Sequence, residues 1–471
     1  MQPLYLAGQW VRPERSLPVL NPYDQTLVSD VGLAGAESLD ATLDAAVAGA
    51  AVMRRLPAYD RAKILRKTSD LMLERQQELG RLISLEEGKT LAEGVFEVTR
   101  AAETMALSAD EARRLTGEVL PLDAAPGGAG KLGFTLRVPC GVVLAVTPFN
   151  FPLNLVCHKV GPALAAGNSV VVKPASDTPL SALRLVELLL EAGLPPLGIA
   201  CLVGRGAEVG EALGADPRVR KISFTGSADV GRRLTQIAGL KRITLELGSN
   251  SPLIVLDDAD LDKATAAIVA TGYSNAGQVC ISTQRVIAQS AVYDALLERL
   301  APRVAAIRTG DPLAPETQMG PMIRERDAQR VEQWVHEAVQ GGARVVAGGG
   351  RSGTRFEPTL VADVAPQMRI SCEELFGPAV AVTKVESLEE ALTLANDSRY
   401  GLSAGVFTRD LSRALRFARE VDSGNLHINW GPGWRADLMP YGGLKDSGFG
   451  KEGPHYAVAE MTEWKTVIVH E

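Results

Sequence analysis

The sequence predicts an α/β fold made of two successive α/β units. Short runs rich in β-branched residues alternate with helix-like segments, first over residues 137–248 and again from residue 253 onward. Several of these runs, such as GVVLAV at 141–146, are apolar throughout. Continuous apolar strands between helices are typical of a parallel sheet that helices cover on both faces. Because 471 residues exceed what one core usually serves, we expect two α/β domains with a cleft between them.

The other elements follow in order along the chain. Residues 39–116 are predicted to form several helices, because apolar residues recur there at helical spacing between charged faces. The glycine- and proline-containing stretch DAAPGGAGK at 123–131 favours an exposed excursion. Helices are expected over 259–272, 291–307 and 325–341. The C-terminal run EWKTVIVH predicts a strand that adds to a sheet elsewhere, such as one on another subunit.

Composition limits the classes of function. The chain has 49 Lys and Arg residues against 56 Asp and Glu residues and a net charge of −7, which argues against nucleic acid as the main partner. No apolar stretch approaches the roughly 20 residues that cross a bilayer, and the N-terminus lacks a secretory signal. Five cysteines lie scattered without a CxxC pair, and the five histidines form no HExxH motif. We therefore expect a cytoplasmic protein with no bound metal and no membrane contact.

Polar residues follow several of the strand-like runs, where an α/β sheet gathers its ligands. Lys173 follows SVVV, and Gly226 and Ser227 form a turn before a helix whose exposed N–H groups could hold a phosphate. Glu246 ends ITLE, and burial there would bring its pKa toward the working range of a general base. Asn150 follows VTPF and could cap the next helix or face an oxyanion. A surface lysine, an ordinary capped turn and a salt-bridged glutamate are the structural alternatives.

Two further patterns carry little weight alone. GRGAEVG at 204–210 resembles a dinucleotide fingerprint but has one residue too many. Cys280 lies among small and polar neighbours in TGYSNAGQVCISTQR. Without other information, a single free cysteine is more often packed and inert than catalytic.

Seven motifs together resemble one family. TPFNFPLN, KPASDTP, FTGSADVG, LELGSNSP, GQVC, EELFGP and PYGGLKDSGFGKEG occur in the order and approximate spacing of the aldehyde dehydrogenase superfamily. The resemblance covers nearly the whole chain. It implies a Rossmann-like coenzyme-binding domain, an α/β catalytic domain and a small β segment for oligomerisation. We assign residues 1–118, 137–248 and 439–455 to the first, 249–438 to the second, and 119–136 with 456–471 to the third.

The resemblance also implies roles for individual residues. Cys280 matches the family's nucleophile, Glu246 its general base and Asn150 its oxyanion donor. A thiolate can attack an aldehyde carbonyl, the Asn150 amide and the Cys280 N–H can hold the resulting alkoxide, and hydride transfer to the nicotinamide leaves a thioester that Glu246 hydrolyses through water. The positions matched to coenzyme contacts are Thr147, Pro148, Phe149, Lys173, Ala175, Ser176, Gly206, Gly210, Phe224, Thr225, Gly226, Ser227, Val230, Leu247, Gly248, Glu374 and Phe376.

The coenzyme is expected to be NAD or NADP. An acidic side chain near the adenosine ribose accepts the 2′-OH and repels a 2′-phosphate. The family's usual glutamate position is Ser176 here, with Lys173 close by, and this departure favours NADP. Asp177 could restore an acidic contact if the loop shifts.

The substrate-binding candidates are polar. His158 and Asn154 share one helix face, four residues apart, and by family position that face lines the aldehyde pocket. Arg113, beside Arg114, and Arg435 are candidates for the same pocket, where a guanidinium suits a carboxylate, sulfonate or phosphate. A histidine that fills the space of an aromatic side chain, and arginines in surface or structural ion pairs, are the alternatives.

The segments HK after FPLN and WRADLMPYGG most resemble the branch of lactaldehyde, sulfolactaldehyde and phosphonoacetaldehyde dehydrogenases. The expected activity is oxidation of a short polar or anionic aldehyde to its carboxylate, by a homodimer or homotetramer. Succinate semialdehyde and non-phosphorylating glyceraldehyde-3-phosphate dehydrogenases are the competing assignments. A cysteine esterase or acylating transferase and a non-catalytic binding protein on the same scaffold are the alternatives from other classes.

Overall fold

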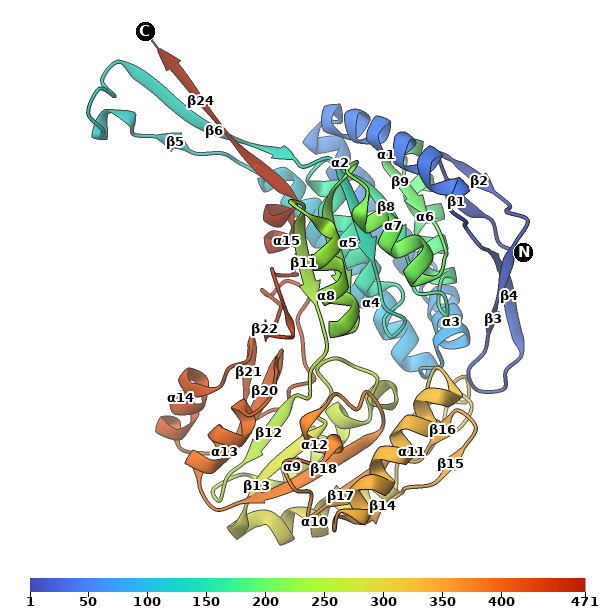
Figure 1. The fold of residues 1–471 in the computed structure, drawn as a ribbon, viewed down its shortest axis with the longest axis vertical. Coiled ribbons are helices and arrows are strands. Elements are labelled where there is room, and N and C mark those ends of the chain that lie inside the picture. The colour runs from blue at the N-terminus through green and yellow to red at the C-terminus, as the bar shows by residue number, and fades with distance from the viewer. Residues whose placement is uncertain (471) are drawn as a thin grey trace.

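The computed structural model describes residues 1–470 and places two sheets in two lobes (Figure 1). The first sheet has the strand order β2-β1-β9-β8-β7-β10-β11-β23. The five central strands, from β9 to β11, pair in parallel, whereas the β2–β1, β1–β9 and β11–β23 pairs at the two edges are antiparallel. The strands are β1 (Leu4–Leu6), β2 (Gln9–Val11), β7 (Val142–Val146), β8 (Ser169–Lys173), β9 (Ile199–Cys201), β10 (Val219–Thr225), β11 (Arg242–Glu246) and β23 (Gly448–Phe449).

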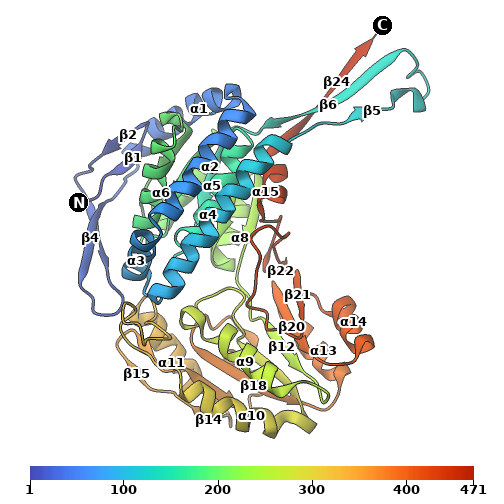
Figure 2. The same cartoon turned by 180° about the vertical axis from the view of Figure 1, so that it is seen from behind.

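Helices cover this sheet on both faces, as the apolar strands require (Figures 1 and 2). The long helix α4 packs against α2, α3 and α5. It begins with a capping box, in which the Thr90 side chain accepts from the Glu93 N–H at 3.3 Å and the Glu93 carboxylate accepts from the Thr90 N–H at 3.0 Å. The helices are α1 (Glu37–Arg55), α2 (Ala58–Glu74), α3 (Gln76–Glu87), α4 (Leu91–Arg114), α5 (Asn154–Ala165), α6 (Leu180–Glu191), α7 (Glu211–Ala215), α8 (Ala228–Ala238) and α15 (Pro454–Glu460).

The second lobe contains the sheet β14-β17-β18-β13-β12-β20-β21, which is parallel except for the β14–β17 pair. The predicted alternation of strands and helices is therefore present in both halves of the chain. The strands are β12 (Pro252–Val255), β13 (Arg285–Gln289), β14 (Arg344–Ala347), β17 (Thr359–Ala362), β18 (Ala379–Val385), β20 (Ser403–Phe407) and β21 (Asn425–Ile428). The helices are α9 (Leu261–Gly272), α10 (Ser290–Ala305), α11 (Glu325–Gln340), α12 (Arg369–Cys372), α13 (Leu388–Asn396) and α14 (Leu411–Glu420).

A three-stranded ribbon projects from the first lobe beyond both sheets (Figures 1 and 2). It consists of β5 (Val119–Leu120), β6 (Lys131–Pro139) and β24 (Thr462–His470), and β24 pairs antiparallel with β6 along its whole length. The predicted C-terminal strand thus finds its partner within the same chain. The exposed stretch 123–131 lies between β5 and β6. None of the helices in residues 1–470 has the length and apolar character needed to cross a bilayer.

An unusual backbone segment leads into Cys280. Asn275, Ala276 and Gly277 all have positive φ, at 48°, 52° and 69°. The left-handed region costs an L-residue about 1–2 kcal/mol, so the surrounding packing must hold this segment. A Cβ on Gly277 would lie 2.1 Å from the carbonyl oxygen of Gly377. The close approach of these two loops fixes the path of the chain toward the cysteine.

We expect Gly277→Ala to destabilise the protein strongly, because the new methyl group adds a steric clash to the backbone strain. The expected loss of unfolding free energy is more than about 3 kcal/mol. Gly353→Ala is the matched control, since Gly353 has a φ of 61° but open space around its Cβ position, and should lose only about 1 kcal/mol. Thermal unfolding of both variants measures the difference. Equal melting temperatures would show that residues 275–277 can relax.

Candidate active site

Two cavities between the lobes meet at Cys280, which is partly exposed. The larger has a volume of about 740 Å³ and lies at the carboxyl ends of the parallel strands β7, β8, β10 and β11. The smaller, of about 170 Å³, lies on the other side of the cysteine. Cys280 and Leu155 line both. A group bound in either cavity can therefore reach the sulfur.

The larger cavity contains nearly all the residues that the family resemblance assigned to coenzyme contacts. These are Thr147, Pro148, Phe149, Lys173, Ala175, Ser176, Gly206, Phe224, Thr225, Gly226, Ser227, Val230, Leu247, Gly248, Glu374 and Phe376. Gly210 was also predicted to contact the coenzyme, but it does not line this cavity. Residues 206–210 form a π-helical turn, so Gly206 faces the cavity while Gly210 packs against the stem of Lys173, which a Cβ would approach to 3.4 Å.

Asp177 was expected to be able to restore an acidic contact near Lys173 and Ser176, but its carboxylate is already paired with another residue. Lys173 is buried, and burial lowers its pKa to about 8. The Ser176 hydroxyl donates to the Gly204 carbonyl at 3.2 Å. Asp177 accepts two hydrogen bonds from the guanidinium of Arg324, one of them from Nε at 2.8 Å. The carboxylate is therefore engaged in an ion pair.

Elsewhere in the larger cavity, Glu374 accepts a hydrogen bond from the Ser249 N–H at 2.9 Å. Burial raises the pKa of this carboxyl to about 7. A side chain at Gly248 would overlap the Glu374 carboxylate, so glycine is required for this contact. The ring of Phe376 meets that of Phe149 edge to face at 5.9 Å. The larger cavity therefore also offers a carboxylate and two aromatic rings.

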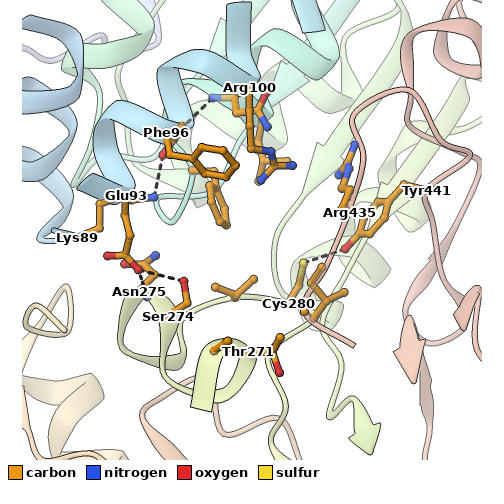
Figure 3. A pocket seen from close by; sticks show the side chains of 18 residues that line it. Lys89, Glu93, Phe96, Arg100, Thr271, Ser274, Asn275, Cys280, Arg435 and Tyr441 are labelled. Carbon is orange, nitrogen blue, oxygen red and sulfur yellow. Dashed lines mark hydrogen bonds and ion pairs between the residues drawn. The ribbon is translucent and has the colours of Figure 1, made fainter. Parts of the chain in front are cut away.

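The smaller cavity has a polar wall that includes two arginines (Figure 3). Arg100 projects from α4, and Arg435 comes from the loop that follows β21. Asn154, at the start of α5, also lines this cavity, as the resemblance implied. Sequence reasoning missed Arg100, although its spacing from Glu97 and Thr104 places the three side chains on one helix face. It also missed Lys89 and Tyr441, two further lining residues.

Two residues that were predicted to contact the substrate, Arg113 and His158, line neither cavity. Arg113 is exposed and lines neither cavity. An α-helix rises about 1.5 Å per residue, so Arg113 lies about 20 Å along α4 from Arg100. Its neighbour Arg114 pairs with Glu111 on the surface. His158 is 1% exposed and lies behind the cavity wall rather than in it.

His158 holds Arg435 in place. Its Nε2 lies 2.8 Å from a carboxylate oxygen of Asp437, and Arg435 Nη2 lies 3.1 Å from both ring nitrogens, which places it against the face of the ring. A neutral ring with hydrogen on Nε2 donates to this carboxylate and presents an uncharged face to the guanidinium. Burial and the nearby Arg435 cation lower the pKa of His158, consistent with that form. Asp437 also accepts two hydrogen bonds from Arg100, at 2.8 and 3.0 Å, so one carboxylate connects both arginines.

The polar groups around Cys280 come from four separate segments. The sulfur lies 3.2 Å from the Tyr441 hydroxyl (Figure 3). The Asn150 amide donates to the Gln278 carbonyl at 2.8 Å, so it lies beside the loop that carries the cysteine. It does not cap α5; the Glu97 carboxylate does, by accepting from the N–H groups of Leu153 and Asn154.

Glu246 ends β11, and its side chain runs toward Gly442, next to Tyr441: a Cβ on Gly442 would lie 2.7 Å from Oε1. Neither carboxylate oxygen has a hydrogen-bond partner among residues 1–470. Burial, and then the neighbouring charge of Glu452, raise the pKa of Glu246 well above its usual range. Burial raises the pKa of the Cys280 thiol to about 12, and Glu246 and Glu374 add to this effect.

Comparisons with known proteins agree with this arrangement. Residues 10–467 match the model of the aldehyde dehydrogenase family. The 3-sulfolactaldehyde dehydrogenase of Priestia megaterium is 45% identical over 99% of this chain and 98% of its own. A solved NADP-dependent enzyme of Escherichia coli has a TM-score of 0.97 at 38% identity, covering 100% of this chain and 98% of its own. Glyceraldehyde-3-phosphate dehydrogenase GapN of Methanocaldococcus jannaschii, solved with NADP, has a TM-score of 0.94 at 35% identity, covering 97% and 100%. This chain belongs to the aldehyde dehydrogenase family.

Proposed function

We propose that this NAD(P)-dependent aldehyde dehydrogenase oxidises a short aldehyde with an anionic head group, and that it prefers NADP. The observation that carries the proposal is the position of Cys280 between a large cavity and a small one whose wall contains Arg100 and Arg435. The aldehyde carbon lies at the sulfur in this arrangement, and its head group extends toward the arginines. The small volume suits a short substrate.

The larger cavity fits a nicotinamide dinucleotide. The first turn of α8, from Ser227 to Val230, lines it, and a helix N-terminus is suited to a phosphate. Lys173 is buried there, and its Nζ donates only a long hydrogen bond to the Pro174 carbonyl within the described chain, at 3.3 Å. Glu374 is placed to accept from a ribose hydroxyl. The coenzyme, when bound, supplies the hydride acceptor.

Three residues carry the chemistry in this proposal. The Cys280 thiolate attacks the aldehyde carbon, and the Asn150 amide with the Cys280 N–H donates to the resulting alkoxide. After hydride has left, the acyl group is held on sulfur as a thioester. Glu246 takes a proton from water, which attacks the thioester and releases the carboxylate product and the thiolate. The unpaired oxygens of Glu246 support this role, because a buried carboxylate without a partner is costly.

The head-group site rests on two arginines whose charges are already partly balanced. Arg100 uses Nε and Nη2 on Asp437, and Nη1 has no partner within residues 1–470. Arg435 uses Nη1 on Glu452, its Nη2 lies against the His158 ring, and its buried Nε lacks a partner in the same range. An unpaired buried donor costs free energy, and an anionic substrate would supply the missing acceptor. A sulfonate, carboxylate or phosphate meets this requirement.

The coenzyme preference rests on residues 173–177. Ser176 is uncharged, and the Asp177 carboxylate is paired with Arg324. A free carboxylate would repel the 2′-phosphate of NADP, but neither of these residues provides one. Lys173 adds a nearby cation, and the preference for NADP follows.

We further propose the assignment of residues 1–118, 137–248 and 439–455 to a coenzyme-binding domain and of 249–438 to a catalytic domain. The ribbon is proposed to join subunits of a cytoplasmic homodimer or homotetramer. The ribbon exposes large apolar side chains, which supports a role in joining subunits. These side chains are Val119, Leu132, Leu136, Trp464, Ile468 and Val469.

The first test separates acylation from deacylation. We expect Glu246→Gln to release one equivalent of reduced coenzyme per subunit in a rapid burst and then to stall, because water is no longer activated. In the native enzyme the deacylation rate should rise with pH, since the raised pKa of Glu246 leaves the carboxyl protonated until the pH passes it. The variant should lose this dependence. Rapid-mixing absorbance of reduced coenzyme measures both.

Cys280→Ala is the control for this experiment, and it should give neither burst nor turnover while it still binds coenzyme. Oxidation by Cys280→Ala would contradict the mechanism. A loss of the burst in Glu246→Gln would indicate that Glu246 acts before acylation. An esterase without dehydrogenase activity would hydrolyse activated esters but reduce no coenzyme.

The second test concerns the head group. His158→Phe removes the two ring nitrogens that contact Arg435 Nη2 and, with them, the donor to Asp437. We expect KM for sulfonated, carboxylated and phosphorylated short aldehydes to rise about tenfold, since a hydrogen bond to a charged group contributes about 1.5–3 kcal/mol. KM for a neutral aldehyde of equal length should change less than about twofold. Arg113→Gln alters an exposed arginine that lies far along α4 from the cavity, and it should change neither KM value. Equal effects of His158→Phe on charged and neutral aldehydes would refute an anionic head group.

The third test concerns the coenzyme. Ser176→Glu places a carboxylate where the 2′-phosphate is expected, so like charges repel. We expect KM for NADP to rise about 100-fold, whereas KM for NAD should stay the same or fall. Initial rates with both coenzymes at a saturating aldehyde concentration give the ratio. A parallel change for both coenzymes would show that Ser176 does not face the adenosine ribose.

A further inference from the structure

We propose that the Tyr441 hydroxyl donates a hydrogen bond to the Cys280 thiolate and thereby acts as a catalytic residue in both the attack and the departure of the sulfur. This inference rests on the proposed role of Cys280 as nucleophile. The motif containing Tyr441, PYGG, was part of the family resemblance, but no function was assigned to the tyrosine.

The contact is direct. The phenolic oxygen lies 3.2 Å from Sγ, and the side chain of Tyr441 is 3% exposed (Figure 3). Among residues 1–470, no other side chain makes a hydrogen bond with this sulfur. In the thiol form either atom can be the donor, but a thiolate has no hydrogen. Once the thiol ionises, Tyr441 must be the donor, and a charge-assisted hydrogen bond is stronger than a neutral one.

The tyrosine is held on two sides. Its backbone N–H donates to the Glu452 carbonyl at 3.2 Å, and the Glu452 N–H donates back to the Tyr441 carbonyl at 2.7 Å. The guanidinium of Arg435 stacks over the ring, 3.9 Å from its centre. A cation over the ring draws electron density from the phenol and favours donation by its hydroxyl. The hydroxyl therefore has a fixed direction toward the sulfur.

The sulfur needs such a donor because its surroundings oppose negative charge. Four ionisable groups influence the charge of Cys280: the carboxylates of Glu246 and Glu374, the Arg435 guanidinium and the Tyr441 phenol. Burial and the two carboxylates raise the pKa of the thiol, whereas the hydrogen bond from Tyr441 and then Arg435 lower it. Burial raises the pKa of Tyr441 well above its ordinary value. The phenol thus keeps its proton and remains a donor.

The same hydrogen bond serves both chemical steps. The partly exposed thiol first loses its proton to solvent water, and Tyr441 stabilises the resulting thiolate. In the attack, the sulfur lone pair forms the C–S bond and the carbonyl π electrons move to oxygen. In hydrolysis, the C–S bond breaks and its electron pair returns to sulfur. Tyr441 then donates to the departing thiolate. The phenol keeps its proton throughout, and no further reactant is needed.

The test is Tyr441→Phe, which keeps the ring beneath Arg435 and removes the hydroxyl. The rate of Cys280 alkylation by iodoacetamide in the coenzyme-free enzyme, followed over pH values below the pKa of the thiol, reports the thiolate fraction. We expect this pKa to rise by about one unit, which is a tenfold smaller thiolate fraction at a given pH below it. We expect kcat to fall about tenfold, with KM for the aldehyde and the affinity for coenzyme nearly unchanged.

Tyr293→Phe is the matched control. Its hydroxyl contacts Asp363 in the second lobe at 3.0 Å, away from both cavities, and its loss should leave the alkylation profile unchanged. An unshifted profile for Tyr441→Phe would overturn the proposal. A rise in KM alone would also overturn it and would make Tyr441 a residue that shapes the cavity. Turnover by Cys280→Ala would instead refute the proposed function, so the two failures are distinguishable.

Discussion

The buried carboxylate of Glu452 organises the active-site region. It accepts from Lys159 on α5 at 2.8 Å and from Arg435 at 3.0 Å. Burial opposes its ionisation, but these two cations keep its pKa well below the usual range. The backbone of Glu452 pairs with that of Tyr441. One residue therefore positions a wall of the smaller cavity and the phenol beside Cys280, and its charge adds to the effect of burial in raising the pKa of Glu246.

Such a cluster is expensive to bury unless each charge is paired. Two desolvated ions recover their lost hydration only when geometry is good and their remaining donors and acceptors are satisfied. Lys159 meets this condition with a second hydrogen bond to Thr225 at 2.7 Å. Glu246 does not, because neither of its oxygens has a partner among residues 1–470. The contrast between a satisfied pair and an unsatisfied carboxylate in the same cluster favours a structural role for Glu452 and a chemical one for Glu246.

Local patterns in the sequence predicted the α/β alternation, whereas most residues of the larger cavity were predicted from the family resemblance. Apolar runs define the strands, and polar residues at strand ends, such as Lys173 and Glu246, meet at the carboxyl edge of a parallel sheet. Residues 206–210 form a single π-helical turn, and the fingerprint-like spacing could not show which of its glycines faces the cavity.

The smaller cavity was harder to predict because it depends on contacts across long sequence separations. Arg113 and Arg100 are on the same helix, and only the packing of α4 shows which end faces the cavity. His158 was expected to touch the substrate, but Arg435 arrives from the loop after β21 and covers it. Glu97 caps α5 from another helix, which leaves Asn150 free to contact the loop of Cys280. No local pattern contains these relationships.

Arg435 connects the two halves of the proposed chemistry. One face of its guanidinium stacks on Tyr441, and its N–H groups hold Glu452 and His158. An anionic head group that binds Arg435 reduces the positive field on the phenol and on the sulfur, because the cation is then shared. A substrate anion therefore weakens one of the two groups that favour the thiolate. The Tyr441 hydroxyl becomes a weaker donor when the field of Arg435 is reduced, but it stays in contact with the sulfur. This hydrogen bond therefore remains to keep the nucleophile available in the complex, where the stabilisation from Arg435 is smallest.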